Sequence, residues 1–208
     1  MDMARVNGKS AAHIVLFVEG DTDEVFFKAL IDYYRLHSRT PLTPCSVYNL
    51  KGVTRYTGKL IAKLKNEILP DANRKGFLIQ AVCCSYDTDV FEKANPLMVD
   101  WKSLEKSIRR MGVEGLIRIG VRSSIEDWIL DDMEGICTFL KIRAVPTSLK
   151  GDDGYSRLSD LYSRAKRSYQ KGYFTKELVS SLDMGKIIKK RSGALMRLEE
   201  VLGVQLLL

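Results

Sequence analysis

Histidine and cysteine are scarce in this chain of 208 residues, and neither is spaced as a metal site would require. The two histidines, His13 and His37, lie far apart and have no cysteine neighbours, which argues against a zinc site. The four cysteines show no C-x-x-C spacing, and two of them are adjacent within an apolar run, where free thiols behave as small hydrophobic side chains. They are Cys45, Cys83, Cys84 and Cys137. We therefore expect a reduced, cytoplasmic protein.

Long apolar segments and nucleotide-binding loops are also missing. No run reaches the ~18–20 apolar residues of a membrane-spanning helix. The polar start of the chain, from Met1 to His13, has neither the apolar stretch nor the cleavage site of an export signal. No G-x-x-x-x-G-K-[ST] loop is present, and residues 52–59 do not form one. We therefore expect neither a membrane protein, nor an exported protein, nor a P-loop ATPase.

What the chain does contain is an ordinary globular composition, with 45% hydrophobic and 28% charged residues. Its net charge of +7 is unevenly distributed, because residues 150–208 hold twelve Lys/Arg but seven Asp/Glu. A basic lobe beside acidic motifs fits a protein that holds a polyanion next to metal-binding carboxylates. A solvated helical face explains the same charge equally well.

Short apolar segments rich in β-branched residues alternate with segments of helical periodicity. The expected strands cover 13–18, 46–50, 77–84 and 116–121, and the expected helices start at Asp21 or cover 56–68 and 101–111. Asp21 and Glu24 predict an N-cap and a capping box, and Pro70 is expected to end the second helix. This alternation predicts an α/β fold, with a parallel sheet flanked by helices, over residues 12–146.

The pattern changes after Pro146. A turn-rich linker covers 150–154, and helices are expected at 155–169, 174–182 and 185–202. We expect residues 155–208 to form a helical C-terminal extension that packs on the α/β domain.

Carboxylates follow three of the expected strands. Glu19 comes directly after the first strand, Asp87 and Asp89 follow the third, and Glu126 lies shortly after the fourth. Because ligands of open parallel sheets bind at the carboxyl ends of the strands, these side chains are expected at one edge. Oxygen-only ligands favour Mg²⁺ or Mn²⁺. Two such ions ~3.5–4 Å apart can stabilise the attacking and leaving oxygens of a phosphoryl displacement.

Each of these features also has an ordinary structural explanation. Asp-x-Asp is frequent in surface turns, a Glu-Gly pair often follows a strand, and Asp21 with Glu24 can simply cap a helix. Glu126 and Asp127 can be first-turn acids favoured by the helix dipole. The order of the acids and their placement at three strand ends favour the metal site.

Two segments resemble a known family of domains. The segment from Phe17 to Phe27, FVEGDTDEVFF, resembles the first motif of Toprim domains, and Tyr86-Asp-Thr-Asp89 resembles their D-x-D motif. Over residues 14–128 the chain is similar to the OLD-family nucleases (overcoming lysogenization defect) and to small stand-alone Toprim proteins of bacterial defence loci. The resemblance implies a Rossmann-like Toprim sheet and a nuclease.

The resemblance also implies the ligands of two Mg²⁺ or Mn²⁺ ions. In OLD nucleases an acid four residues after the first Glu, and a Ser-x-Glu after a later strand, belong to the metal site; Asp23 and Ser124-Ile-Glu126 match them. The implied ligands are Glu19, Asp87 and Asp89 for one ion, and Asp23, Glu126 and the assisting Ser124 for the other.

Basic residues of the extension complete the expected site. The resemblance implies a lysine near the scissile phosphate, for which Lys171 is the first candidate. Contacts to nucleic-acid phosphates are expected from Lys186, Lys189, Lys190 and Arg191, the three lysines also being further candidates for the catalytic position.

OLD proteins couple their Toprim domain to an ATPase in the same chain, whereas a P-loop is missing here. The expected function is therefore a metal-dependent nuclease of antiphage defence that acts on DNA or RNA with a separate ATPase subunit. A homo-oligomer is left open. A non-catalytic Toprim subunit that binds an ATPase or nucleic acid, and a nucleotidyl- or phosphoryl-transferase, stay as alternatives.

Overall fold

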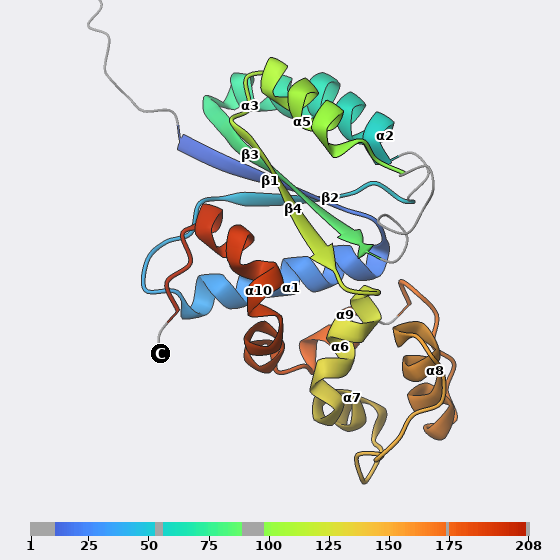
Figure 1. The fold of residues 1–208 in the computed structure, drawn as a ribbon. Coiled ribbons are helices and arrows are strands. Elements are labelled where there is room, and N and C mark those ends of the chain that lie inside the picture. The colour runs from blue at the N-terminus through green and yellow to red at the C-terminus, as the bar shows by residue number, and fades with distance from the viewer. Residues whose placement is uncertain (1–10, 53–55, 89–97, 174, 207–208) are drawn as a thin grey trace, which may run out of the picture.

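Four parallel strands form the sheet at the centre of the molecule (Figure 1). They are β1 (Ala11–Val18), β2 (Cys45–Asn49), β3 (Phe77–Asp87) and β4 (Gly115–Val121), in the order β2-β1-β3-β4. In the register, Leu16 of β1 lies opposite Val47 on one side and Cys83 on the other. The computed structural model describes residues 11–52, 56–88, 98–173 and 175–206. The predicted α/β fold with a parallel sheet is confirmed.

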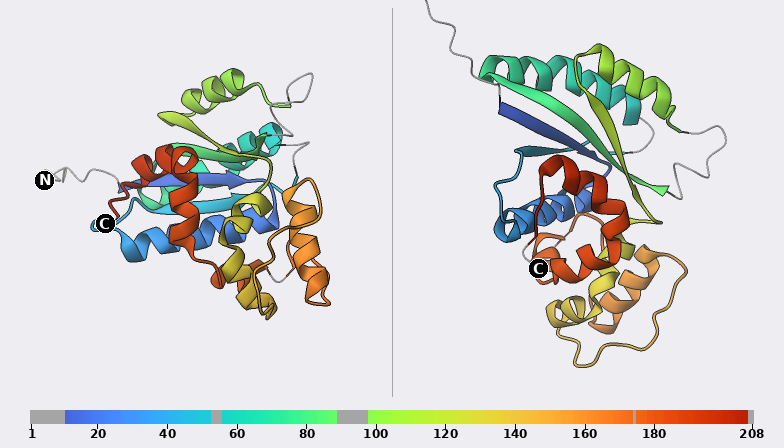
Figure 2. Two further views of the ribbon diagram at one scale, coloured as in Figure 1. Left: turned by 60° about the horizontal axis from the view of Figure 1, so that its bottom comes forward. Right: turned by 60° about the vertical axis from the view of Figure 1, so that its left-hand side comes forward.

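Helices cover both faces of this sheet (Figures 1 and 2). One face carries α2 (Tyr56–Lys63), a π-helical turn (Leu64–Ile68), α3 (Leu69–Lys75) and α5 (Trp101–Arg110). The other face carries α1 (Asp21–His37) and α10 (Met184–Leu202). A lobe extends away from the end of β4, built from α6 (Ile125–Ile129), a 3-10 turn (Leu130–Asp132), α7 (Met133–Leu140), α8 (Gly154–Arg164) and α9 (Thr175–Ser180). Among the described residues, no helix combines the length and the apolar character needed to cross a membrane.

The side chains of β1 explain why both faces are covered. Ile14, Leu16 and Val18 belong to the core beneath α1 and α10, while Val15 and Phe17 belong to the core beneath α2, α3 and α5. All five are fully buried. Successive strand residues point to opposite faces, so a central strand covered on both faces requires a continuous apolar run.

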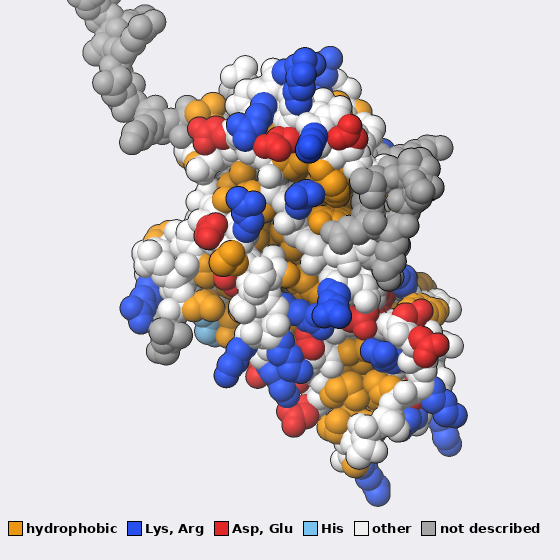
Figure 3. Space-filling view, viewed as in Figure 1, with side chains coloured by type: hydrophobic (Ala, Val, Ile, Leu, Met, Phe, Trp, Pro, Cys, Tyr) orange, Lys and Arg blue, Asp and Glu red, His pale blue; other side chains and the backbone are white. Residues whose placement is uncertain are grey.

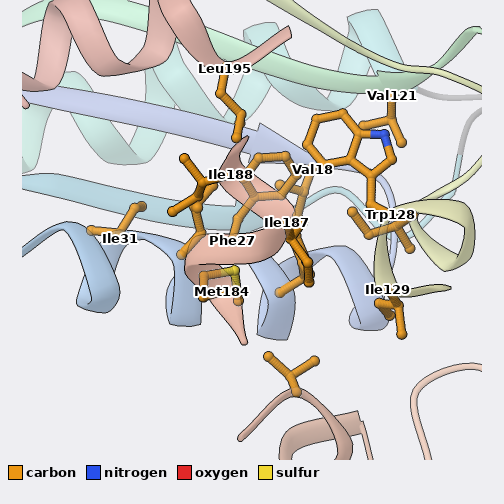
Figure 4. Close-up of a cluster of buried hydrophobic side chains, with 14 of the residues drawn as sticks. Val18, Phe27, Ile31, Val121, Trp128, Ile129, Met184, Ile187, Ile188 and Leu195 are labelled. Carbon is orange, nitrogen blue, oxygen red and sulfur yellow. The ribbon is translucent and has the colours of Figure 1, made fainter. Parts of the chain in front are cut away.

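The core between the sheet and α10 is built around Trp128 (Figure 4). This side chain is fully buried, and its ring centre lies 6.0 Å from that of Phe26 and 6.3 Å from that of Phe27. Ile187 and Leu195 of α10 are fully buried in the same core. α10 therefore completes the core to which α1 also contributes.

The segment after α10 returns to the connection between α1 and β2. The backbone N–H of Arg39 donates to the carbonyl oxygen of Gln205 at 2.8 Å, and the N–H of Gln205 donates to Ser38 Oγ at 3.0 Å. Ser38 and Leu206 also form an antiparallel bridge. These bonds fix the end of α10 beside the end of α1.

The prediction that Pro70 ends the second helix is wrong. Helical structure continues from Tyr56 to Lys75, because the π-helical turn closes directly before α3. Pro70 thereby occupies the first turn of α3. A proline is tolerated in a first turn, where its missing N–H is not needed.

Asp21 is not the N-cap of α1, so the predicted capping box is wrong. Gly20 occupies the N-cap position with extended backbone, and no side chain caps the helix. The carboxylate of Asp21 instead accepts a hydrogen bond of 2.7 Å from Asn49 Nδ2, and Glu24 pairs with Lys28 at 2.5 Å. Both carboxylates are therefore engaged elsewhere.

The element boundaries also differ from those predicted. β3 extends to Asp87, beyond the predicted end at residue 84. α8 ends at Arg164, before the predicted end at residue 169, because the backbone of Lys166 turns the chain with a φ of 56°. Residues 165–173 consequently lie outside the helices. The division into units 12–146 and 155–208 stays a prediction.

Truncation of Leu195 tests the packing of α10. We expect Leu195→Ala to lower the free energy of unfolding by about 2–5 kcal/mol, because the side chain is fully buried. Met196→Ala is the matched control on the same helix; its side chain is 53% exposed, so a change within about 0.5 kcal/mol is expected. Urea denaturation followed by tryptophan fluorescence measures both, and equal losses would contradict this packing.

Candidate active site

The candidate site lies where the chain leaves β1 and β3 in opposite directions. β1 leads through α1 to β2 on one side, and β3 leads to β4 on the other. The carboxyl ends of two such strands form the crevice in which open parallel sheets bind ligands. Glu19 follows β1, and Asp87 is the last residue of β3. Glu19 Oε1 accepts a hydrogen bond of 2.7 Å from the backbone N–H of Asp87, which joins the two strand ends directly.

The first turn of α1 adds Asp23 to this crevice. Asp23 is only 8% exposed, although its side chain is a carboxylate. A Cβ atom at Gly20 would lie 3.2 Å from Asp23 Oδ2, so the absence of a side chain there leaves room for the carboxylate. Glycine between Glu19 and Asp21 thus allows the turn from β1 into α1 to pass close to Asp23.

Glu126 contributes a fully buried carboxylate from α6, which follows β4. Its Oε1 accepts a hydrogen bond of 3.0 Å from the hydroxyl of Tyr169 and lies 3.5 Å from Lys171 Nζ. Its Oε2 is buried without a hydrogen-bond partner in the described part of the chain. One oxygen therefore remains available for a further ligand.

Residues 165–173 bring the cationic part of the site. Tyr169 and Lys171 reach Glu126 from this segment, and the backbone N–H of Gly172 donates to Thr22 Oγ1 at 3.2 Å. Gly172 has a φ of 78°, and a Cβ atom there would lie 3.1 Å from Asp21 Cβ. Both the backbone conformation and the close approach to α1 therefore require glycine.

These residues line a pocket of about 410 Å³ at the end of the sheet. Its lining is Glu19, Gly20, Asp21, Thr22, Asp23, Asn49, Lys51, Gly52, Asp87, Lys171 and Gly172. Carboxylates and two lysines, Lys51 and Lys171, thus line one pocket, and Glu126 is joined to it through Lys171.

Burial and neighbouring carboxylates raise the pKa values of two acids of the site, Asp23 and Asp87. Burial, and after it the charge of Glu126, raises the pKa of Asp23 to about 7. Burial, and after it the charges of Asp23 and Glu19, raises the pKa of Asp87 to about 9. Burial lowers the pKa of Lys171, but the carboxylates of Glu126 and Asp87 outweigh it and leave that pKa above its usual value. A bound cation would favour the charged forms of Asp23 and Asp87 and would lower the pKa values of both carboxyl groups.

The donors fit Mg²⁺ or Mn²⁺ in kind. All are carboxylate oxygens, one of them the buried Oε2 of Glu126 that lacks a hydrogen bond among the described residues. In the ranges that the structure describes, however, no three His, Cys, Asp or Glu side chains stand together as a metal-binding group. Asp89, which was also predicted as a ligand, lies outside the described residues.

Ser124 occupies the N-cap position of α6. Its hydroxyl and its backbone N–H both donate to Asp127 Oδ2, at 3.2 and 3.3 Å. This pairing accounts for Ser124 as the start of a helix, and its predicted role at the metal stays a prediction.

Basic residues of α10 pair with acids of the lobe. Lys186 Nζ lies 3.2 Å from Asp132 and 2.7 Å from Glu134. Lys190 Nζ donates to the backbone carbonyl of Asp131 at 2.9 Å, and Arg191 forms an ion pair with the side chain of Asp131. These intramolecular pairs hold α10 against the lobe.

Lys189 is exposed. Binding of nucleic acid by Lys186, Lys189, Lys190 and Arg191 stays a prediction.

Glu19, Asp87 and Glu126 are predicted from the sequence to lie at or just after strand ends, whereas no role is predicted for Tyr169 or Thr22. Tyr169 was expected at the end of a helix, whereas it points its hydroxyl at Glu126 from an irregular segment. The available signal is Gly172, because a glycine between two expected helices marks a special backbone position.

No protein-family model matches the sequence, and no curated protein matches it significantly. Three solved structures of the C-terminal region of the OLD protein from Xanthomonas campestris pv. campestris are similar to the chain. The structure phased with platinum aligns over 92% of this chain and 97% of its own, with 16% identity and a TM-score of 0.42. The corresponding values are 93%, 97%, 16% and 0.45 for the mercury-phased structure, and 93%, 96%, 18% and 0.44 for the iodine-phased structure. Similarity at this level does not establish a family or an activity.

Asp87→Asn tests the crowding of negative charge. The folded protein holds the proton of Asp87 up to a pH of about 9, against an ordinary pKa of 3.8, so stability falls as the pH rises between these values. Asparagine has no proton to lose, so the variant does not carry the free-energy cost of ionising a buried carboxyl group. In EDTA we expect the variant to be more stable than the wild type at pH 9, by about 1–2 kcal/mol, and to gain less at pH 5.

Urea denaturation at both pH values measures the difference. Asp32→Asn is the control, because Asp32 lies on the exposed side of α1. A gain of the same size at pH 5 and pH 9 would contradict the raised pKa of Asp87.

Proposed function

We propose that this chain is a metal-dependent nuclease that hydrolyses nucleic-acid phosphodiester bonds by a two-metal mechanism. The supporting observation is that carboxylates from three strand ends converge with Lys171 around one crevice. Glu19 and Asp87 are joined by a hydrogen bond, Asp23 shares their pocket, and Glu126 pairs with Lys171. The resemblance of the motifs to those of Toprim domains supports the same proposal.

Mg²⁺ or Mn²⁺ is the proposed cofactor, as two ions. Bound there, the ions would polarise the phosphate and lower the pKa of a water molecule. One ion would be held by Glu19, Asp87 and Asp89, and the other by Asp23 and Glu126 with the assistance of Ser124.

The protein's own groups position the phosphate and the charges around it. The side chain of Lys171 is 58% exposed, so its ammonium group can donate to a phosphate oxygen while it remains beside Glu126. The hydroxyl of Tyr169 holds Glu126 Oε1 in place. The bond from Gly172 to Thr22 fixes the segment that carries both residues against α1.

The partners and the biological setting are further parts of this proposal. Nucleic acid, either DNA or RNA, is the proposed substrate, and basic residues of the C-terminal region would contact its phosphates. A separate ATPase subunit and a role in antiphage defence follow from the resemblance to OLD nucleases combined with the missing P-loop.

A non-catalytic Toprim subunit is the second candidate. The ion pair of Lys171 with Glu126 favours it, as does the absence of a ready-made three-ligand group among the described residues. Such a subunit would bind an ATPase or nucleic acid without cleaving it.

A nuclease assay separates the two candidates. The full chain is incubated with Mn²⁺ or Mg²⁺ and plasmid DNA, single-stranded DNA or tRNA. We expect cleavage by the wild type and by the Asp32→Ala control, and a loss of at least about 10²-fold with Asp87→Ala or Glu126→Gln. Cleavage by Asp87→Ala at the wild-type rate would contradict the proposed site, and inactivity of every protein would favour the non-catalytic subunit.

Lys171→Ala tests the role of the lysine. If Lys171 neutralises charge on the phosphate, kcat should fall by about 10²–10³-fold with little change in KM. Lys176→Ala is the matched control, since Lys176 is exposed on the neighbouring helix α9. Equal kcat values for Lys171→Ala and Lys176→Ala would rule out this role.

Metal binding can be measured without substrate. We expect Mn²⁺ at 100 times its Kd to stabilise the wild type by about 2.7 kcal/mol, and to leave Asp87→Ala with a smaller gain. Thermal unfolding with and without the ion gives both values. An unchanged melting temperature of the wild type would contradict the proposed cofactor.

A further inference from the structure

A second pocket lies along the same segment that carries Tyr169 and Lys171. Its volume is about 590 Å³, within the usual size range of ligand pockets. It is lined by Phe139, Tyr162, Arg167, Ser168, Gln170, Tyr173 and Glu177. Figure 3 shows hydrophobic surface over α7, the helix that carries Phe139.

The residues of this segment divide between the two pockets. Ser168 and Gln170 line the second pocket, whereas Tyr169 and Lys171 contact Glu126 of the carboxylate site. The next residues continue the division, because Gly172 lines the carboxylate pocket and Tyr173 lines the second one. A ligand that spans both pockets would therefore run along residues 168–173.

The lining has the chemistry that recognises a flat aromatic ring. Phe139 and Tyr162 lie with ring centres 6.3 Å apart, and the guanidinium of Arg167 lies 5.7 Å from the centre of the Phe139 ring. Tyr173 adds a third ring, which is 63% exposed at the edge of the pocket. Aromatic faces and a guanidinium are the groups on which nucleobases stack.

Polar groups of the lining suit the edge of such a ring. Gln170 and Ser168 supply donors and acceptors, and Glu177 supplies an acceptor. The hydroxyl of Tyr162 is buried without a hydrogen-bond partner among the described residues, although this residue is only 2% exposed. This hydroxyl is itself out of contact with solvent, so the polar contacts to a ligand in the pocket are expected from Ser168, Gln170 and Glu177.

We propose that this pocket binds an unpaired nucleobase of the nucleic acid whose phosphate enters the carboxylate site. The inference rests on the proposed function, since that function supplies the polynucleotide. It adds that the substrate is single-stranded, or locally unpaired, where it crosses residues 168–173. A base inside a duplex cannot offer its face to the rings of this pocket.

Equilibrium binding tests this inference without requiring cleavage. The full chain is titrated, in EDTA, against a fluorescent single-stranded oligonucleotide, the same strand in a duplex, and the same strand with abasic sites. We expect Tyr173→Ala to weaken binding of the single strand by about 5- to 150-fold, the range for loss of one stacked base. Tyr173→Phe keeps the ring and should bind within about twofold of the wild type.

Arg167→Gln and Lys176→Gln form a pair matched in charge. Both side chains are exposed, so both variants are expected to fold, but only Arg167 lines the pocket. We expect the Arg167 variant to bind the single strand more weakly than the Lys176 variant, and the two to bind the duplex alike. Equal losses in this pair on the single strand would overturn the inference.

The abasic strand separates base recognition from phosphate recognition. The wild type and Tyr173→Ala should bind it equally, because no base is left to stack. A loss with Tyr173→Ala that persists on the abasic strand would overturn the inference. If no metal or substrate supports cleavage, the proposed nuclease fails, while this comparison still decides whether the pocket binds a base.

Discussion

The burial of one carboxylate, that of Glu126, is the constraint on which the arrangement of the site depends. A fully buried charge is costly unless a partner stabilises it. Tyr169 and Lys171 provide the described partners, and both come from a segment more than forty residues further along the chain. The lobe and the last helix must therefore pack where they let this segment reach Glu126.

The same segment is held at its other end by α1. Gly172 can approach α1 because it has no side chain, and its N–H bonds to Thr22 next to Asp23. The carboxylates of Glu19 and Asp23 thus line the same pocket as Lys171, whose positive charge partly neutralises theirs. Packing and electrostatics reinforce each other here, since the contacts that order residues 165–173 also bring positive charge to an acidic crevice.

Much of the fold could be predicted because its signals are local. A continuous apolar run such as residues 14–18 predicts a strand covered on both faces, and the residue after a strand lies at its carboxyl end whatever else the chain does. The convergence of Glu19 and Asp87 follows from that rule. The prediction for Pro70 is wrong because a π-helical turn directly before α3 places the proline in the first turn of a new helical segment. Such a turn depends on tertiary packing, which local sequence patterns do not indicate.

Tertiary contacts explain what could not be predicted. Tyr169 looked like the last residue of a helix, because nothing near it in the sequence records that Glu126 lies opposite. The sequence gives the positive charges of Lys186 and Arg191, but it does not indicate that these side chains form ion pairs with acidic residues of the lobe. The metal ions and the role of Asp89 stay predictions.

The long separation between Glu126 and Lys171 also has a consequence in time. A chain emerging from the ribosome contains every predicted acidic ligand before it contains Lys171, and α10, which closes the core over Trp128, follows Lys171. The acidic crevice therefore exists in sequence before its lysine and its supporting helix do. Under the proposed function, the site would therefore be complete only after the residues from Lys171 to the end of α10 have been synthesised.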